Sequence, residues 1–254
     1  MRAAALLVAA LALAACGHDP DPVPGAPDAA LQSEAGEVFY NPVARAGEPS
    51  ERGEAGRLVA DMAGLWSNQT QYDAAPDALK REPAAGAPYD WLDLQYAQFH
   101  PVRAPQIGDH VVYLEWRSGA ADGPVSRQRL WAFRENAEGG LAGMDFYTFR
   151  DPAPFEGRGG EAGAFEQVSP EDLIAYPYGC TLTARVPAWD GHAFDVAPED
   201  CVITARSGRR MGIRADVEIA PWRIGYSEAG LLEDGSYAFL VPGGDAYEFR
   251  RVEP

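Results

Sequence analysis

Two arginines and two aromatic residues share one face of a strand-like run between residues 126 and 133. Arg127, Arg129, Trp131 and Phe133 are spaced by two positions, and alternate residues of a β-strand point to the same face. Guanidinium groups form forked hydrogen bonds with carboxylates, and aromatic rings pack against flat conjugated molecules. If this face lines a cavity, it suits a flat ligand that bears acid groups. If it meets solvent, it is a salt-bridged surface.

A second run, Val112–Arg117, mixes the same residue types. Tyr113, Glu115 and Arg117 alternate with Val112, Leu114 and Trp116, so both faces of this run carry large side chains. The same two interpretations apply, and the residues alone leave both open.

The two distal cysteines are more typical of a structural disulfide than of a catalytic site. Cys180 and Cys201 are the two that lie far from the N-terminus, and two cysteines in an oxidising compartment usually pair. The alternative is two buried free thiols. Histidines are scattered singly and no Cys-x-x-Cys pair occurs, so the sequence predicts no metal site.

The third cysteine, Cys16, follows an export signal. Arg2 precedes an apolar run from Ala3 to Ala12, and Leu13-Ala14-Ala15-Cys16 matches the bacterial lipobox, in which the thiol is acylated and becomes the new N-terminus. An ordinary signal peptide with a chance cysteine is the alternative. The apolar run is too short to span a bilayer, which needs ~20 residues. We therefore expect a lipid-anchored protein of the bacterial cell envelope. Gly17 favours the outer membrane, on its periplasmic side.

The amino-acid composition restricts the classes of partner that this protein is expected to bind. The net charge is −17, with 21 basic and 38 acidic residues among 254, which disfavours nucleic acid and anionic surfaces. An apolar content of 46% and six tryptophans support a sizeable core. We predict a signal peptide over residues 1–15, a lipidated flexible tether over 16–50, rich in Pro, Ala and Gly, and a single β-barrel domain over 51–254.

The elements that must position these residues are mostly strands. Residues Glu54–Trp66 have the 3.6-residue apolar period of an amphipathic helix, and residues 73–88 form an Ala/Pro-rich loop. From Trp91 onward the period is two, interrupted by turn sequences such as Asp190-Gly191 and Asp234-Gly235. About eleven short strands with hairpin turns predict an antiparallel barrel or sandwich. A short helix is expected near Ser169–Ile174.

The sequence does not match two other common catalytic or binding motifs. Gly225–Ala229 lacks the second glycine of a nucleophile elbow and lies between hairpins. No phosphate-binding Gly-rich loop precedes a helix.

The order of motifs from Leu58 to the C-terminus resembles the CpcT/CpeT chromophore lyase family. The resemblance covers about three quarters of the chain, counting residues from Leu58 onward. Trp116 and Ser126 depart from it, since the family has Gln and Tyr at those places. The matching segments are Leu58–Gln69 with its Trp-Ser-Asn-x-x exit, Val112–Glu115, Ser126–Trp131 with its Arg-Gln-Arg, Phe146–Pro152, Tyr178–Cys180 with the later Cys201, and Tyr247–Arg251.

The resemblance implies an all-β fold, a calyx-like (lipocalin-like) antiparallel barrel with one N-terminal amphipathic helix, often dimeric. It also implies a lyase that attaches a linear tetrapyrrole (a bilin) to a cysteine of an acceptor protein, with no other cofactor required. Arg127 and Arg129 would then pair with the bilin propionates and Glu115 with the pyrrole nitrogens. Tyr113, Trp131 and Tyr147 would form aromatic walls.

Two alternatives stand beside the lyase. One is an envelope lipoprotein with a lipocalin-like barrel that binds an amphipathic ligand without catalysis. The other is a purely structural envelope protein with a filled barrel. The interior decides among the three, because a ligand site needs an open barrel lined by Arg127, Arg129 and Glu115.

Overall fold

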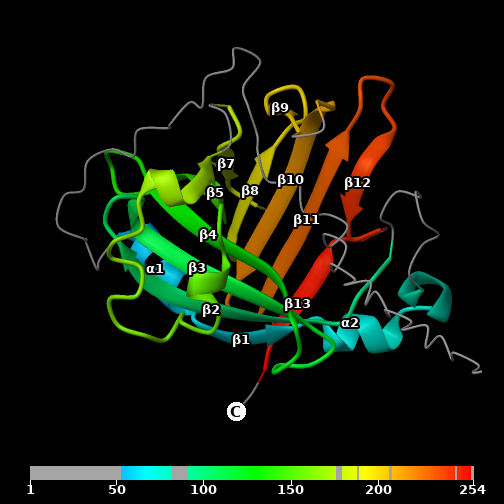
Figure 1. The fold of residues 1–254 in the computed structure, drawn as a ribbon, viewed down its shortest axis with the longest axis horizontal. Coiled ribbons are helices and arrows are strands. Elements are labelled where there is room, and N and C mark those ends of the chain that lie inside the picture. Colours follow the sequence, from blue (N-terminus) through cyan, green and yellow to red (C-terminus); the bar gives the residue numbers. More distant parts are fainter. Residues whose placement is uncertain are drawn as a thin grey trace, which may run out of the picture.

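Ten antiparallel strands close into a ring in the computed structural model (Figure 1). Their order around the ring is β11-β13-β1-β2-β3-β4-β5-β7-β8-β10, and β10 pairs with β11 to complete it. The protein is therefore mostly β and forms a closed antiparallel barrel, as the strand pattern predicted. The structure describes residues 53–81, 91–175, 179–187, 189–205, 208–243 and 245–252. Cys16 and Tyr178 lie outside these ranges.

The elements have the following bounds. The ring strands are β1 (Gly64–Ser67), β2 (Gln95–Ala104), β3 (Gly108–Ser118), β4 (Val125–Glu135), β5 (Leu141–Phe149), β7 (Leu182–Arg185), β8 (His192–Val196), β10 (Arg210–Ala220), β11 (Arg223–Leu231) and β13 (Tyr247–Arg251). Outside the ring are β6 (Leu173–Ala175), β9 (Val202–Thr204), β12 (Tyr237–Val241), the α-helices α1 (Glu54–Met62) and α2 (Gln69–Ala74), and the 3₁₀ turns η1 (Asp77–Lys80), η2 (Ala153–Phe155) and η3 (Pro170–Asp172).

The predicted N-terminal helix ends earlier than expected. It stops at Met62, and Gly64 takes a φ of +126°, which a residue with a side chain rarely adopts. Trp66 then lies in β1 between β2 and β13, where its indole N–H donates to the Met62 carbonyl at 2.9 Å. The apolar period continues through residue 66 because α1 and β1 both direct their large apolar side chains into the same core.

A second helix, α2, was not expected from the sequence. It has six residues, too few for a clear period. Contacts with distant chain hold it in place. Gln71 donates to the Ala246 carbonyl and accepts from the Glu248 N–H, at 2.8 and 3.0 Å. The short helix expected near residue 169 is the 3₁₀ turn η3, capped by Ser169 and followed directly by β6. None of the helices described is long and apolar enough to span a membrane.

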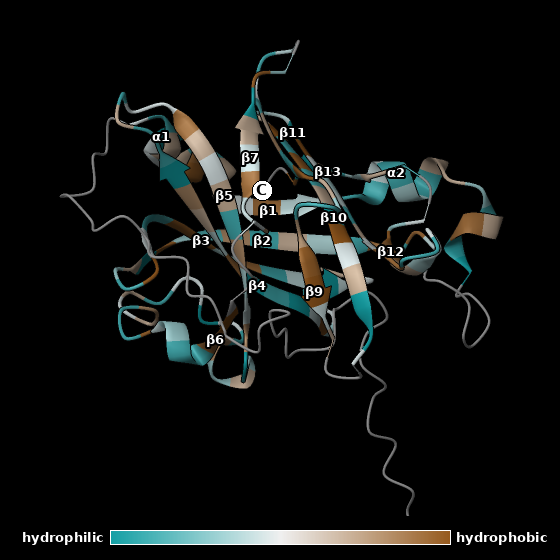
Figure 2. Cartoon of the chain, turned by 90° about the horizontal axis from the view of Figure 1, so that it is seen from above, coloured by the Kyte–Doolittle hydropathy of each residue, from teal (hydrophilic) through white to brown (hydrophobic). Residues whose placement is uncertain are grey.

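One continuous core fills the barrel. Strand alternation directs one side chain in two inward, and bands of differing hydropathy succeed one another along β10 (Figure 2). Helix α1 adds its apolar face to this core and contacts β2, β3 and β4. The α1 side chains in the core are Ala55, Leu58, Val59 and Met62.

A smaller apolar cluster lies on the outside of β3, β4 and β5. The segment from residue 150 to 172, here named the covering segment, packs Phe155, Phe165 and Val168 onto the outward side chains of these strands. Both faces of the three strands are therefore buried, which explains why both faces carry large residues. The strand side chains in this cluster include Tyr113, Leu130, Ala132, Tyr147 and Phe149.

Four strands extend beyond the ring. β11 pairs with β13 through Ile224–Tyr226 and with β12 from Glu228 onward. On the other side, β10 pairs with β8 through Ala215–Ile219 and with β9 nearer its start, and β10 and β11 pair with each other. We call β9, β12 and the ends of β10 and β11 that pair with them the flap. The wall of the barrel thus divides at Glu228.

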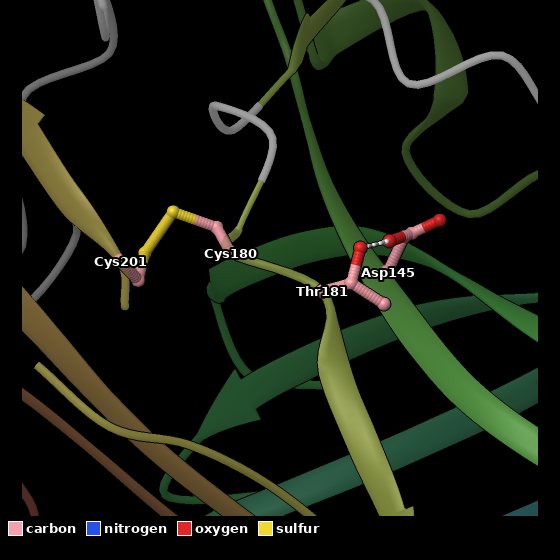
Figure 3. Close-up of a disulfide and its surroundings, with 4 residues drawn as sticks. All are labelled: Asp145, Cys180, Thr181 and Cys201. Carbon is pink, nitrogen blue, oxygen red and sulfur yellow. Dashed lines mark hydrogen bonds between the residues drawn. A yellow bond between two sulfur atoms is a disulfide. The ribbon is translucent and has the colours of Figure 1, made fainter. Parts of the chain in front are cut away.

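A disulfide ties the flap to the ring. Cys180, just before β7, is bonded to Cys201, just before β9. The next residue, Thr181, donates its hydroxyl to Asp145 Oδ1 of β5 at 2.6 Å (Figure 3). This is the cysteine pair that the sequence analysis expected to bond.

Candidate functional site

Arg127, Arg129 and Trp131 point into the barrel. All three come from β4, and alternation along the strand places them on its inner face. Side chains from three other strands meet them there. We call these eight residues the inner cluster: Leu114 and Trp116 from β3, Arg127, Arg129 and Trp131 from β4, Phe146 from β5, and Tyr226 and Glu228 from β11.

An ion pair crosses the barrel inside this cluster. Arg127 Nη1 lies 3.2 Å from Glu228 Oε2 and donates to Tyr226 Oη at 2.6 Å. The Tyr226 hydroxyl donates to the same Glu228 oxygen at 2.6 Å. Glu228 is only 3% exposed. Because a buried carboxylate is costly without a partner, Arg127 and Tyr226 fix it in this position.

Aromatic rings surround the Arg127 guanidinium. Its Cζ lies 4.9 Å from the Trp116 ring centroid and 5.4 Å from that of Tyr226, within cation–π range. The Trp131 and Tyr226 rings stack at 6.2 Å with an interplanar angle of 12°. The inner wall therefore offers cations and flat ring faces side by side.

Trp116 has an unused donor in this wall. Its side chain is buried, and its indole N–H meets no hydrogen-bond acceptor among the residues that the structure describes. A buried N–H without an acceptor costs about 1–3 kcal/mol. Such a group marks a place where an acceptor on another molecule would be favoured.

Arg129 completes the basic part of the wall. It is 7% exposed, and its Nη1 donates to the Gln128 carbonyl at 2.9 Å. Its charge also reaches Tyr226. Burial raises the pKa of the Tyr226 hydroxyl well above its usual value, the Arg127 cation acts against that rise, and Glu228 adds to it. The phenol thus stays protonated, as a donor, at neutral pH.

The inner cluster is tightly packed. The space that its residues enclose does not admit a water-sized molecule. The open interior that the sequence analysis required for a ligand site is therefore not observed in this cluster, and any ligand must displace side chains there. Two hollows lie elsewhere on the described chain. One, of about 360 Å³, adjoins α2 and Leu92, and the other, of about 530 Å³, adjoins Arg134 and Thr181 near the disulfide. Within the described ranges, no group of three or more His, Cys, Asp or Glu side chains is placed to hold a metal.

The structure divides the six residues that the sequence assigned to one ligand site. Tyr113 and Tyr147 lie outside the barrel, in the apolar cluster beneath the covering segment. Glu115 is on the same outer face, so it does not line the interior as expected. The alternation was correct within each strand. It does not reveal which face is inner when both faces are buried.

Glu115 instead fastens the covering segment to the barrel. Its Oε2 accepts from the Tyr113 hydroxyl and from the Gly157 N–H, both at 2.8 Å, and its Oε1 accepts from Arg117 Nε at 2.9 Å. Gln128 donates to the Tyr113 oxygen at 2.7 Å. Burial alone would raise the pKa of Glu115, but the Gly157, Tyr113 and Arg117 donors outweigh it and lower that pKa.

Sequence reasoning did not find Tyr226 and Glu228. The signal was present, since Ile224, Tyr226 and Glu228 alternate with small residues at Gly225 and Ser227. A lone glutamate on an apolar strand face is unusual. It indicates either an exposed edge or a buried partner, and here the partner is Arg127.

Comparisons with known proteins support the fold alone. No family model matches the chain, and no curated protein does. Among solved structures, the selenomethionine form of the CRL protein of Arabidopsis is similar, with a TM-score of 0.55 and 15% identity. The alignment covers 78% of this chain and 97% of that chain. Identity at this level shows a shared architecture and nothing about activity.

Proposed function

We propose that this protein binds a flat, conjugated ligand with acid groups, of the linear tetrapyrrole (bilin) type, at the inner cluster. The observation that carries the proposal is the buried Trp116 N–H, which meets no acceptor in the described part of the chain and lies in a wall with Arg127, Arg129 and stacked aromatic rings. Guanidinium groups and an indole donor match carboxylates and a carbonyl-bearing conjugated system. The resemblance to the CpcT/CpeT lyases points to the same ligand class.

Binding requires the inner cluster to open. Glu228 now accepts from Arg127 and Tyr226, so a ligand carboxylate that reaches Arg127 takes the place of the Glu228 oxygen. Arg129 receives the second acid group. The wall divides beside Glu228, where β11 passes from β13 to β12. Movement of the flap there can make room without breaking the ring.

Attachment of the ligand to an acceptor cysteine is the lyase form of this proposal. In this form the Tyr226 hydroxyl gives its proton to a bilin carbon as the acceptor sulfur adds to the ligand, and the proton of the thiol replaces it on the Tyr226 oxygen, so the addition leaves Tyr226 protonated. The alternative is a lipocalin-like barrel that binds its ligand without chemistry. A covalent adduct that survives denaturation in the presence of an acceptor protein separates the two. An acceptor and a homodimer remain predictions from the resemblance.

Replacement of Arg129 by alanine should weaken bilin binding about ten- to a hundredfold. A charged hydrogen bond to a carboxylate contributes about 1.5–3 kcal/mol, and 1.4 kcal/mol is a factor of ten in affinity. The measurement is an absorbance titration of the protein with biliverdin. The matched control is Arg214→Ala, because Arg214 lies exposed on the outer face of β10.

Two results would contradict this proposal. If the wild type causes no spectral change, the bilin is not the ligand. If Arg129→Ala and the wild type bind equally, the inner arginines have no part in binding.

We also propose that the protein is a lipid-anchored component of the bacterial cell envelope, on the periplasmic side of the outer membrane. The support is the sequence Leu13-Ala14-Ala15-Cys16. Cys16→Ser removes the thiol that would be acylated, so metabolic labelling with a fatty acid should be lost completely and the precursor should remain uncleaved. Labelling that persists in Cys16→Ser would refute the anchor.

A further inference from the structure

A row of tryptophans and arginines lines one end of the barrel. The turn from β7 to β8 carries Trp189, and the turn from β10 to β11 carries Trp222. The Arg223 guanidinium lies 5.5 Å from the Trp189 ring and 5.7 Å from the Trp222 ring, and the Arg250 guanidinium lies 4.5 Å from the Trp222 ring. We call this row, with the neighbouring Val186 and Val252, the tryptophan rim.

The rim is continuous because its strands are neighbours in the ring. The order β7-β8-β10-β11-β13 places the ends of these strands side by side, about 4.8 Å apart for each step. His192 opposite Ile219 and Ile224 opposite Phe249 show that the two turns and the C-terminal strand end lie at the same end of the barrel. Figure 1 shows the C-terminus emerging there, below β13.

Exposed apolar side chains gather on this rim. Among the described residues, five large hydrophobic side chains are exposed, and three of them are here: Val186 at 98%, Trp222 at 55% and Val252 at 36%. Val186 lies between β7 and β8, Trp222 between β10 and β11, and Val252 directly after β13. Tryptophan beside arginine is the combination that anchors proteins at the level of lipid headgroups, since the ring is apolar with a polar N–H and the arginine stem is apolar with a charged tip.

The described chain also begins at this end. Fifty-two residues precede Gly53, and they include the apolar run Ala3–Ala12. The Oε1 atom of the next residue, Glu54, lies 3.6 Å from Nδ1 of His192. His192 is the first residue of β8 and follows the turn that carries Trp189. The described part of the chain therefore begins beside the rim.

We propose that the tryptophan rim is a membrane contact, which seats the barrel end-on on a zwitterionic lipid surface with Trp222 in the headgroup layer. The rim arginines are balanced by Glu218 and Glu248, at 3.5 Å for Arg223–Glu248 and 3.6 Å for Arg250–Glu248. With a net charge of −17, the protein is repelled by anionic lipid. The contact is independent of the ligand proposed for the inner cluster.

Flotation with phosphatidylcholine vesicles tests the contact. The protein is the chain from Gly17 onward, which lacks both the acylated Cys16 and the apolar run Ala3–Ala12, so that neither contributes to binding. The variants are Trp222→Ser and Val186→Ser. Trp222→Ser should reduce vesicle partitioning about tenfold, because one large apolar side chain no longer leaves water. Leu79→Ser and Tyr237→Ser are the matched controls. Both side chains are exposed to a similar degree, at 40% and 37%, and lie away from the rim.

Further readouts make the outcome decisive. Brominated lipid should quench part of the tryptophan fluorescence, and Trp222→Ser should reduce that part, with the remainder coming from Trp189. Vesicles containing phosphatidylglycerol should bind more weakly than neutral ones. The proposal is overturned by absence of vesicle binding, by equal losses in rim and control variants, or by stronger binding to anionic vesicles.

Discussion

Glu115→Gln should lower the free energy of unfolding by about 3 kcal/mol. The Glu115 carboxylate accepts from Tyr113, Gly157 and Arg117, and the last two offer it only N–H donors. An amide can accept at one end only, and its NH₂ group would point at other N–H or O–H groups. Leaving buried donors without an acceptor costs about 1–3 kcal/mol, and loss of the buried ion-pair partner adds to that. Urea unfolding of both proteins measures the difference.

The same substitution should flatten the pH dependence of stability in acid. The folded state lowers the pKa of Glu115 below its ordinary value of 4.5. Its contribution is therefore fully present above pH 4.5 and disappears as the pH falls through the lower, folded pKa. The wild type should lose this part of its stability in that window, whereas Glu115→Gln should not. Urea midpoints at several pH values below 6 show the effect.

The covering segment should also loosen, because Gly157 loses its tie to the barrel. Limited proteolysis by trypsin at Arg158 should become faster in Glu115→Gln. Glu166→Gln is the matched control, since Glu166 belongs to the same segment but forms only an exposed pair with Arg103 at 3.4 Å; it should stay within about 0.5 kcal/mol of the wild type. Equal stability of Glu115→Gln and the wild type would contradict the clamp.

Removal of the disulfide should cost about 3 kcal/mol. Cys180 and Cys201 are separated by 21 positions, and closing a loop of that size restricts the unfolded chain by about this amount. The double variant Cys180→Ser/Cys201→Ser should unfold at lower urea than the oxidised wild type. Amide exchange should rise first in β9 and the start of β10, because the bond attaches the flap to β7.

Reductant provides the internal control for this prediction. With dithiothreitol the wild type should fall to the stability of the double variant, and the variant itself should not respond. Thiol counting on the denatured, non-reduced wild type should detect no free thiol at these two positions. Two free thiols there, or a variant as stable as the oxidised protein, would contradict the pairing.

Much of the barrel could be predicted because strand alternation is a local property. The predicted turns Asp190-Gly191 and Asp234-Gly235 lie between β7 and β8 and between β11 and β12. β1 could not be predicted in this way. Its four residues carry the apolar period of α1, and only pairing with β2 and β13 makes them a strand. Such pairing between distant segments is not visible in a short window of sequence.

The candidate site could be predicted in part. The spacing of Arg127, Arg129 and Trp131 predicts that they share one face of a strand, but only the structure shows that this face is the inner one. The outward position of Glu115 and Tyr113 does not, because the covering segment buries them as deeply as the core. Because solvent is excluded from both faces of these strands, both faces carry large residues. The alternation of polar and apolar residues then no longer shows which face points into the barrel. The pairing of Glu228 with Arg127 depends on barrel closure, which joins residues about a hundred positions apart.

The ring has a seam where its first and last strands meet. Trp66 of β1 stands opposite Arg251 of β13, and the Val252 N–H donates to the Leu65 carbonyl at 2.9 Å. Until β13 has been synthesised, β1 and β11 each lack a neighbour on one side. Closure of the barrel therefore waits for β13 and is dominated by contacts of high sequence separation, a topology that folds slowly, in milliseconds to seconds. A nascent chain of this protein stays open along one edge until β13 is available.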